Sequence, residues 1–150
     1  MEFVAEAPCI AERHIEGWTI DPDPADKNRV IDSIIQHLSA AYRLGPSVLF
    51  KYRLCLDEAI TNAICHGCRG VENAKVTVDF YHSGDRWALR VVDPGKGFDP
   101  NEIPDPSEPG SEFKESGRGI LILQRYTDKL VYSKSGTEQI FWMDTTELQG

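Results

Sequence analysis

The order in which two hydrophobic periodicities follow one another constrains the fold of this chain more than any other feature. Residues 24–67 carry helical spacing through two successive segments, whereas residues 75–92 alternate apolar and polar side chains around a turn at residues 83–85. Helices that follow one another, and strands that are joined by a tight turn, are not typical of the alternating strand–helix array of a parallel sheet. The pattern therefore predicts an α+β fold built as a two-layer α/β sandwich.

The same patterns locate the individual elements. They predict, in chain order, a strand at 13–20, a helix from Asp23 to Gly45, a second helix from about Pro46 to Gly67, strands at 75–82 and 86–93, a helix that starts at Ile120 and a hairpin over 129–144 that turns at 135–137. Asp23 can cap the first helix, Pro24 suits its first turn, and the glycine at position 45 suits its end. No internal repeat or linker divides the sequence, so we expect one domain over residues 1–150.

Charge and composition narrow the classes of function. The net charge is −8 and the sequence pI is about 4.9, without a block of lysines and arginines. This balance argues against DNA or RNA as a direct partner but not against a nucleotide. No apolar run approaches the roughly 20 residues that cross a bilayer, and the acidic N-terminus lacks the features of a signal peptide, so we expect a cytoplasmic protein without a membrane partner. The four cysteines offer the pair in "CHGC" but no second pair at comparable spacing, which favours reduced thiols over a zinc site.

The segment "LDEAITNAICHG", residues 56–67, puts an acid and an amide on a helix that is otherwise mostly apolar. Glu58 and Asn62 are four residues apart and therefore project from one face. Alanines and isoleucines on the other sides indicate that most of this helix is buried. Polar groups on such a helix need partners, or they face a cleft in which something polar binds.

Two short segments rich in glycine follow. Gly95 and Gly97 come directly after a strand that ends in Asp93, and they let the backbone adopt positive φ and approach a ligand, although an ordinary Asp-Pro-Gly turn also explains them. The sequence GRG at residues 117–119 precedes a helix, where free N–H groups and the positive end of the helix dipole can face an anion. Neither segment decides a function alone, because short glycine motifs are common.

Taken in this order, "DEAITNAICHG", "VVDPGKGFDP" and "ESGRGILIL" resemble the N box and the two glycine boxes of the GHKL (Bergerat-fold) ATP-binding domain. Within that group the chain resembles the bacterial anti-sigma-factor serine kinases, a small single-domain branch that includes switch-protein kinases, over nearly its whole length. The resemblance implies a mostly antiparallel mixed sheet with helices packed on one face. It also implies that the domain binds ATP and ADP together with Mg²⁺.

The resemblance further implies roles for residues of the catalytic centre. Glu58 would be the catalytic base that orients and deprotonates a serine hydroxyl; a solvated helix acid is the alternative, which the apolar surroundings disfavour. Asn62 would hold Mg²⁺ through its amide oxygen. Asp93 would accept a hydrogen bond from the adenine N6 amine, a task that suits a buried carboxylate and that guanine, with a carbonyl at this position, would not match.

The glycine boxes and the last hairpin would complete the nucleotide site. Gly95 and Gly97 belong to it through the first glycine box. The backbone of Gly117 to Gly119 would embrace the phosphates, with Arg118 as a counter-charge, although a solvated arginine at a helix start is an equal alternative. Thr137 matches a family threonine on the adenine side of the pocket, and a mere turn residue is the alternative.

The resemblance implies a lid and protein partners as well. The acidic stretch with several prolines between Phe98 and Ser116 corresponds to the ATP lid of this fold. Arg29 aligns with a family arginine that contacts protein partners, and a surface arginine is an equal alternative. The implied partners are a STAS-domain anti-anti-sigma protein as substrate, a sigma factor that is sequestered, and a second copy of the chain in a homodimer.

The lead interpretation is therefore a protein serine kinase that also acts as an anti-sigma factor. The rival is a module that keeps the fold and the nucleotide pocket but works by partner exchange with little or no kinase activity. The intact pair of Glu58 and Asn62 favours the kinase.

Overall fold

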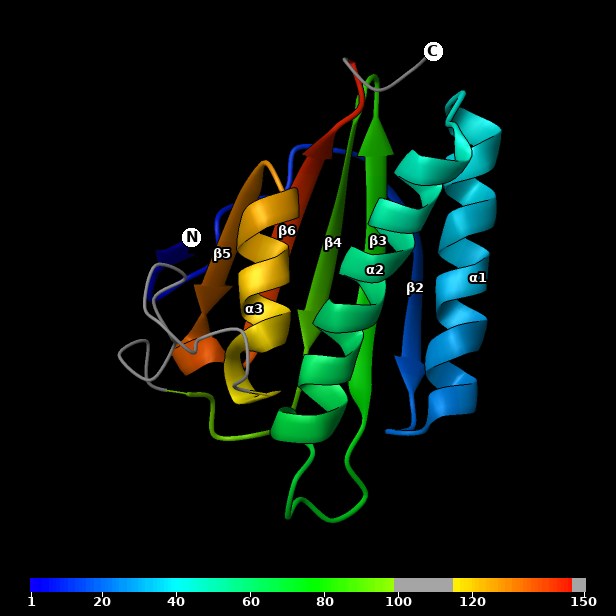
Figure 1. The fold of residues 1–150 in the computed structure, drawn as a ribbon. Helices are drawn as coiled ribbons and strands as arrows, with labels where there is room; N and C mark the ends of the chain where they lie inside the picture. The colour runs from blue at the N-terminus through cyan, green and yellow to red at the C-terminus, as the bar shows by residue number, and fades with distance from the viewer. Residues whose placement is uncertain (99–114, 147–150) are drawn as a thin grey trace.

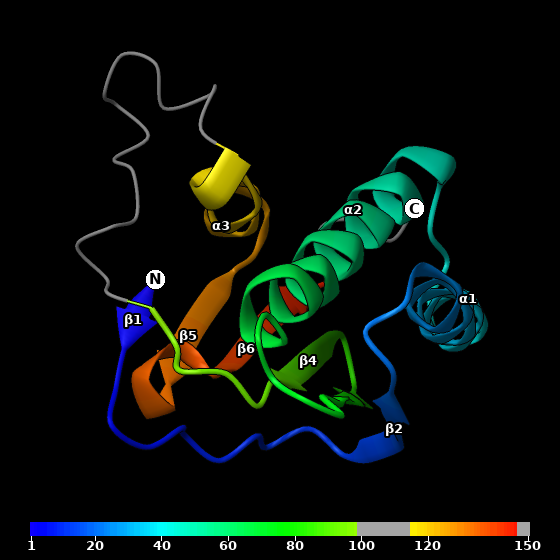
Figure 2. The same ribbon diagram turned by 90° about the horizontal axis from the view of Figure 1, so that it is seen from below.

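Over residues 1–98 and 115–146, the part of the chain that the computed structural model describes, a six-stranded sheet carries three helices on one face (Figure 1). The strands are β1 (Glu2–Phe3), β2 (His14–Ile20), β3 (Val76–Ser83), β4 (Arg86–Val92), β5 (Lys129–Ser133) and β6 (Glu138–Asp144). The helices are α1 (Pro24–Ala41), α2 (Pro46–Asn62) and α3 (Glu115–Tyr126). All three helices lie on the same side of the sheet in both ribbon views (Figures 1 and 2), so the predicted two-layer sandwich is confirmed.

The sheet is mixed but almost entirely antiparallel. Its strand order is β1-β5-β6-β4-β3-β2, and within the described residues only β1 and β5 pair in parallel. β3 and β4 form the predicted hairpin through a turn at Gly84, whose φ is +59°. β5 and β6 form the second predicted hairpin around a short 3₁₀ turn, Lys134–Gly136. The prediction of an α+β fold with a mostly antiparallel mixed sheet is thereby confirmed.

The first helix, α1, begins where the sequence predicts but ends earlier. The Asp23 carboxylate accepts a hydrogen bond from the Ala25 N–H at 2.7 Å and caps the helix. The helix stops at Ala41, where Tyr42 turns to an extended backbone. The ring of Tyr42 is buried, and its hydroxyl donates to the Arg86 carbonyl at 3.2 Å.

The prediction that Gly45 ends this helix is wrong. Gly45 has an extended backbone and is the N-cap of the next helix, which Pro46 opens. The buried contact of Tyr42 therefore overrides the local preference of glycine for a helix end, because a tertiary contact can outweigh a propensity of this size.

The core lies between the helices and the sheet and is rich in aromatic rings. Trp87 of β4 makes edge contacts with Tyr52 of α2 and Phe141 of β6, at ring-centroid distances of 5.1 and 5.5 Å. All three side chains are fully buried, and large buried rings of this kind dominate the energetics of a core. They fix α2 across the middle of the sheet. None of the helices in the described part of the chain is long and apolar enough to cross a bilayer.

The face of the sheet opposite the helices is crossed by the N-terminal part of the chain, as Figure 2 shows for the segment between β1 and β2. On that face the apolar side chains of this segment pack against a small cluster of the sheet: Val4, Ala7 and Ile10 against Ala88, Val131, Ile140 and Trp142. We call residues 1–13 the N-terminal arm. The sequence analysis did not predict β1, because a two-residue strand carries no alternation to detect.

Candidate functional site

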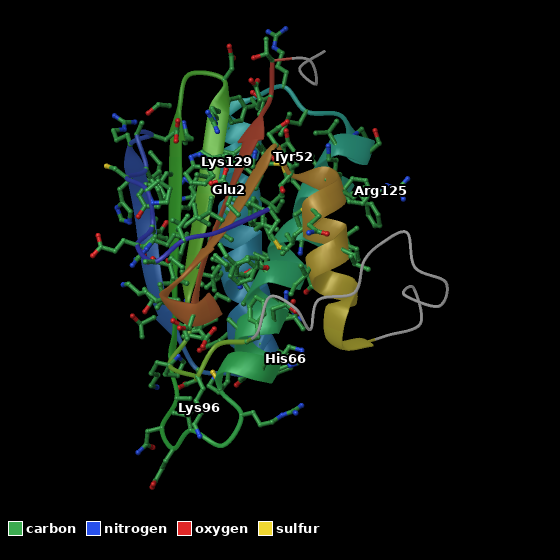
Figure 3. All side chains as sticks on the ribbon, turned by 90° about the vertical axis from the view of Figure 1, so that its left-hand side faces the viewer. Glu2, Tyr52, His66, Lys96, Arg125 and Lys129 are labelled. Carbon is green, nitrogen blue, oxygen red and sulfur yellow. The ribbon has the colours of Figure 1, made fainter. Side chains whose placement is uncertain are left out.

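A cavity of about 300 Å³ lies among the C-terminal end of α2, the loop after β4, the start of α3 and the β5–β6 hairpin. Its lining residues come from segments far apart in the sequence: Asn62, His66, Gly67, Asp93, Gly97, Phe98, Ile120, Tyr132, Gly136 and Gln139. Figure 3 shows His66, in the helical turn that follows α2, and Lys96, in the loop after β4, at the same end of the molecule. The two motifs that the sequence places 31 residues apart, at Asn62 and Asp93, line one space in the structure.

The acid and the amide of α2 meet the backbone of α3. A Cβ atom added to Gly119 would lie 2.7 Å from Glu58 Oε2 and 3.0 Å from Asn62 Oδ1, so only glycine allows this approach without a shift. Glu58 is half-buried. The Asn62 Nδ2 is buried and has no hydrogen-bond partner within the described residues. The N box and the second glycine box are therefore in direct contact.

Helix α3 starts earlier than the sequence analysis predicts. It begins at Glu115 rather than at Ile120, so Gly117 and Arg118 lie in its first turn and Gly119 follows them. Glycine within a helix costs about 1 kcal/mol relative to alanine, and the close packing of Gly119 against α2 offsets that cost. Backbone N–H groups of a first turn have no partner inside the helix, so this end keeps the character of an anion site that the sequence predicts.

Asp93 follows the last residue of β4 and lines the cavity. Its N–H donates to the Thr137 carbonyl at 2.9 Å, and its Oδ1 accepts from the Gly95 N–H at 2.9 Å. Burial raises the pKa of this carboxyl above its ordinary value, and the bond from Gly95 acts in the opposite direction. The hydrogen bond from Gly95 is the kind expected of an Asp-Pro-Gly turn, so the turn and the cavity residue are the same feature.

Both glycines of the loop after β4 are required by close contacts. A Cβ atom on Gly95 would lie 2.5 Å from the Gly67 carbonyl oxygen. Gly97 has a φ of +79°, and a Cβ atom there would lie 1.7 Å from the Ser135 carbonyl oxygen. This loop is thus held between the end of α2 and the β5–β6 turn.

The remaining predicted site residues lie beside the cavity or away from it. The Thr137 hydroxyl donates to the Lys134 carbonyl at 2.9 Å, which is a turn contact, while its own carbonyl accepts from Asp93. Arg29 is exposed on α1, with an ion pair to Asp26 at 3.4 Å. The side chain of Arg118 and residues 99–114 of the predicted lid lie outside what the structure describes, and the last residue of that lid, Glu115, opens α3.

The sequence analysis missed the contribution of the last hairpin to the floor of the cavity. Gln139 is 4% exposed, and its Nε2 donates to the Ala59 carbonyl at 2.7 Å. The Tyr132 hydroxyl donates to Gln139 Oε1 at 3.4 Å. The sequence carries a signal for this role, because Gln139 follows the same alternation in β6 as Phe141 and Met143, which belong to the main core, and an apolar residue is expected at its position.

A short π-helix, Ala63–Gly67, continues α2 into the site. It follows directly on Asn62, and the Ala63 N–H approaches the carbonyls of both Ala59 and Ile60. Segments of this kind are frequent at functional sites. Here the segment brings His66 and Gly67 to the cavity wall.

The fold and the site together define the class of this protein. An antiparallel sheet covered by helices on one face, an acid–amide pair on the central helix and two glycine segments around a half-buried aspartate are the features of a GHKL-type domain. The chain belongs to the histidine kinase-like ATPase domain family, whose family model matches residues 20–144. Membership of this family implies that the domain binds ATP.

The chain is also similar to curated proteins over part of its length. The chain is similar to the serine-protein kinase RsbW of Listeria innocua, at 31% identity over 91 residues, which are 55% of this chain and 57% of the relative. It is similar to the anti-sigma F factor of Thermoanaerobacter, at 27% over 96 residues (60% and 65%), and to the serine/threonine-protein kinase BtrW of Bordetella bronchiseptica, at 22% over 102 residues (67% and 72%). The chain thus spans little more than half the length of the RsbW proteins that it matches. These relatives are named as protein kinases and as an anti-sigma factor.

Proposed function

We propose that this chain is an anti-sigma factor with ATP-dependent protein serine kinase activity, working as one domain over residues 1–150 in the cytoplasm. It would transfer the γ-phosphoryl group of ATP to a serine of a STAS-type anti-anti-sigma partner, and it would sequester a sigma factor. The observation that carries the proposal is the contact of Glu58 and Asn62 with Gly119 at the cavity. That contact joins a carboxylate, a metal-binding amide and a helix start, which are the groups that phosphoryl transfer needs.

Asn62 would hold Mg²⁺. Its amide is the part of the site with an unmet hydrogen-bonding capacity, because Nδ2 is buried without a partner among the described residues. An Asn amide presents either its oxygen or its nitrogen after a flip, and the oxygen is a suitable ligand for a hard cation. Within the described residues no group of three or more His, Cys, Asp or Glu side chains gathers, and Mg²⁺ fits such a site because it takes few protein ligands and completes its shell with phosphates and water.

Glu58 would act as the base. When bound, Mg-ATP supplies the phosphoryl group and the charge that neutralises the phosphates. The serine hydroxyl oxygen forms a bond to the γ-phosphorus while the bond to the β–γ bridging oxygen breaks, ADP leaves, and the hydroxyl proton passes to Glu58. The half-buried position of Glu58, one turn before Asn62, suits a group that receives this proton next to the metal.

Asp93 would read the adenine base. Its Oδ1 is engaged by the Gly95 N–H, so the second carboxylate oxygen is the one available to the N6 amine. Gly95 and Gly97 shape the loop beside it, and Thr137 supports Asp93 through its backbone carbonyl. The N-terminal turn of α3, with Gly117, Arg118 and Gly119, would bind the phosphates.

The protein partners are proposed from the relatives. One of these is named an anti-sigma factor, and others are named serine-protein kinases, which supports a sigma factor and a phosphorylated protein as partners. Arg29 is 59% exposed and lies on α1, away from the cavity residues, where a partner can reach it. A homodimer is proposed on the family resemblance alone.

The decisive experiment is incubation of the purified chain with Mg-ATP and each STAS-domain protein encoded nearby, followed by mass spectrometry of both proteins. We expect one phosphate on a serine of one STAS partner. If no STAS partner gains phosphate while the chain still binds ATP and a sigma factor, the protein is a nucleotide-binding partner-switch module instead of a kinase.

A further inference from the structure

Three aromatic rings join the N-terminal arm to the wall of the cavity. Phe98 and Tyr132 line the cavity, and Phe3 of β1 contacts both of them. The ring centroid of Phe3 lies 5.4 Å from that of Phe98, with an edge-to-face angle of 82° between the ring planes. It also lies 5.4 Å from the ring centroid of Tyr132, with an angle of 19° between the planes, which is a stacked arrangement. Phe98 and Tyr132 are themselves 5.1 Å apart at 82°. Each ring therefore touches the other two in a geometry that aromatic pairs prefer.

Phe98 sits in a slot that Phe3 closes on one side. The Phe98 N–H donates to the Ser135 carbonyl at 3.0 Å, which fixes its backbone. A Cβ atom on Gly136 would lie 2.7 Å from two atoms of the Phe98 ring, so the turn presses directly against it. Gly136 and Tyr132 form two sides of the slot, and the ring of Phe3 forms a third.

The arm is anchored independently of the Phe3 ring. β1 pairs in parallel with β5, with Phe3 opposite Tyr132, and the Val4 N–H donates to the Tyr132 carbonyl at 2.9 Å. Further along the arm, the Glu12 carboxylate accepts a hydrogen bond from the Trp142 Nε1 at 3.0 Å, on the face of the sheet opposite the helices. In Figure 2 the loop after β4 ends next to β1 at this edge, and Figure 3 labels Glu2 and Lys129 on the same edge.

We propose that the N-terminal arm completes the nucleotide site of this chain, with Phe3 as a positioning residue that holds Phe98 and Tyr132 in the cavity wall. The inference rests on the proposed binding of nucleotide in this cavity. The arm lies before residues 20–144, the part of the chain that the family model matches, so its role would be an addition to the family domain. A cavity wall that moves keeps less contact with a bound nucleotide, so loss of the Phe3 ring loosens binding without removing any group that touches the ligand.

The test compares Phe3→Ala with Ile10→Ala in the full chain. Ile10 belongs to the same arm but packs on the opposite face of the sheet, so its loss weakens the arm without touching the aromatic slot. Phe3→Ala removes two aromatic pairs, and the loss of one such pair implies a factor of about 2 to 12. Calorimetry with Mg-ADP should therefore show a Kd for Phe3→Ala that is at least about 2-fold above wild type. The Kd of Ile10→Ala should stay within about twofold of wild type. Phe3→Leu, which keeps apolar volume, should fall between wild type and Phe3→Ala and serves if Phe3→Ala does not fold.

A second measurement does not need nucleotide. Hydrogen exchange of the Phe98 amide, followed by NMR in the free protein, should be faster in Phe3→Ala and unchanged in Ile10→Ala, because only the first opens the slot. Equal exchange and equal Kd in Phe3→Ala and wild type would overturn the proposal, as would equal effects of Phe3→Ala and Ile10→Ala. If wild type binds no ADP, the nucleotide function fails, and the exchange rates alone decide whether Phe3 positions Phe98.

Discussion

Gly67 and Asp93 are in contact so close that no side chain fits between them. A Cβ atom on Gly67 would lie 2.1 Å from Asp93 Cγ and 2.4 Å from its Oδ1. Gly67 ends the π-helix that continues α2, and Asp93 follows β4. This contact joins the N box to the first glycine box, and it fixes the direction in which the carboxyl group faces the cavity.

We expect Gly67→Ala to displace the Asp93 carboxyl and to weaken ATP binding. Overpacking of this kind costs about 1–3 kcal/mol, so thermal unfolding should occur at a lower temperature and the Kd for ATP should rise by about tenfold. Gly45→Ala is the matched control, because a Cβ atom at Gly45 meets nothing within 4 Å. Equal ATP affinity in Gly67→Ala and Gly45→Ala would contradict the role of this contact.

The fold could be predicted because each of the two periodicities extends over two long neighbouring segments. Helical spacing over residues 24–67 and alternation over residues 75–92 each give one solution for the buried face. The errors in the predicted helix bounds occur where a contact between residues distant in the sequence determines the local structure. Tyr42 ends α1 before Gly45 because its hydroxyl reaches Arg86, and nothing near Tyr42 in the sequence announces that bond.

The candidate site could be predicted only in part for the same reason. Its motif residues could be predicted because a glycine, an aspartate or an asparagine at the end of a strand or helix indicates a turn, a cap or a ligand from the local sequence alone. Gln139 and Tyr132 lie in strands whose role depends on which helix covers them. Phe3 stands in a strand of two residues, and only the pairing of β1 with β5 brings it to the cavity wall.

Asp93→Asn should abolish the preference of the site for adenine over guanine. The Asn oxygen would keep the bond from the Gly95 N–H, so its NH₂ group would face the base where the second carboxylate oxygen now does. That donor opposes the adenine N6 amine and suits the guanine carbonyl. We expect wild type to bind ATP at least about tenfold more tightly than GTP, and the ratio to shift towards GTP by a similar factor in the variant, since an unpaired buried donor costs about 1–3 kcal/mol. Calorimetry with both nucleotides measures this, and equal affinity of wild type for ATP and GTP would remove Asp93 as the base reader.

The same substitution should increase stability against unfolding at neutral pH. Burial raises the folded-state pKa of Asp93 above the ordinary 3.8, so the folded protein binds more protons than the unfolded chain between these two values. The unfolding free energy therefore falls as pH rises from 3.8 through the raised pKa, and the loss persists at neutral pH. Asn has no such loss, so urea midpoints of Asp93→Asn should exceed those of wild type at pH 7 and the difference should shrink towards pH 4. A wild-type midpoint above that of the variant at pH 7 would show that Asp93 stabilises the nucleotide-free fold.

Gln139→Leu should destabilise the floor of the cavity. It removes one donor to the Ala59 carbonyl, which then keeps only the shared contact with the Ala63 N–H. It also leaves the buried Tyr132 hydroxyl without its Gln139 acceptor, so we expect a total cost of about 1–3 kcal/mol in the free energy of unfolding. Tyr132→Phe is the comparison, because it removes only the long 3.4 Å bond to the same side chain and should cost less than about 1 kcal/mol. Urea denaturation of wild type and the two variants measures both losses in the free energy of unfolding. A larger loss for Tyr132→Phe would mean that the tyrosine hydroxyl contributes more to stability than the bond from Gln139 to the Ala59 carbonyl.

Glu58→Gln and Asn62→Ala should separate the chemical step from metal binding. Glutamine keeps the size that packs against Gly119 and removes the base, so ATP binding should stay near wild type while phosphoryl transfer falls by about 10²–10⁴. Asn62→Ala removes the proposed ligand of Mg²⁺, so binding and transfer should weaken together, and Mg²⁺ should strengthen ATP binding less than it does in wild type. Calorimetry with and without Mg²⁺, alongside single-turnover transfer to the STAS partner, measures both effects. If Glu58→Gln transfers phosphate at the wild-type rate, another group is the base. If Mg²⁺ strengthens ATP binding in Asn62→Ala as much as in wild type, the metal is bound by other residues, although Glu58 and Asn62 both contact Gly119.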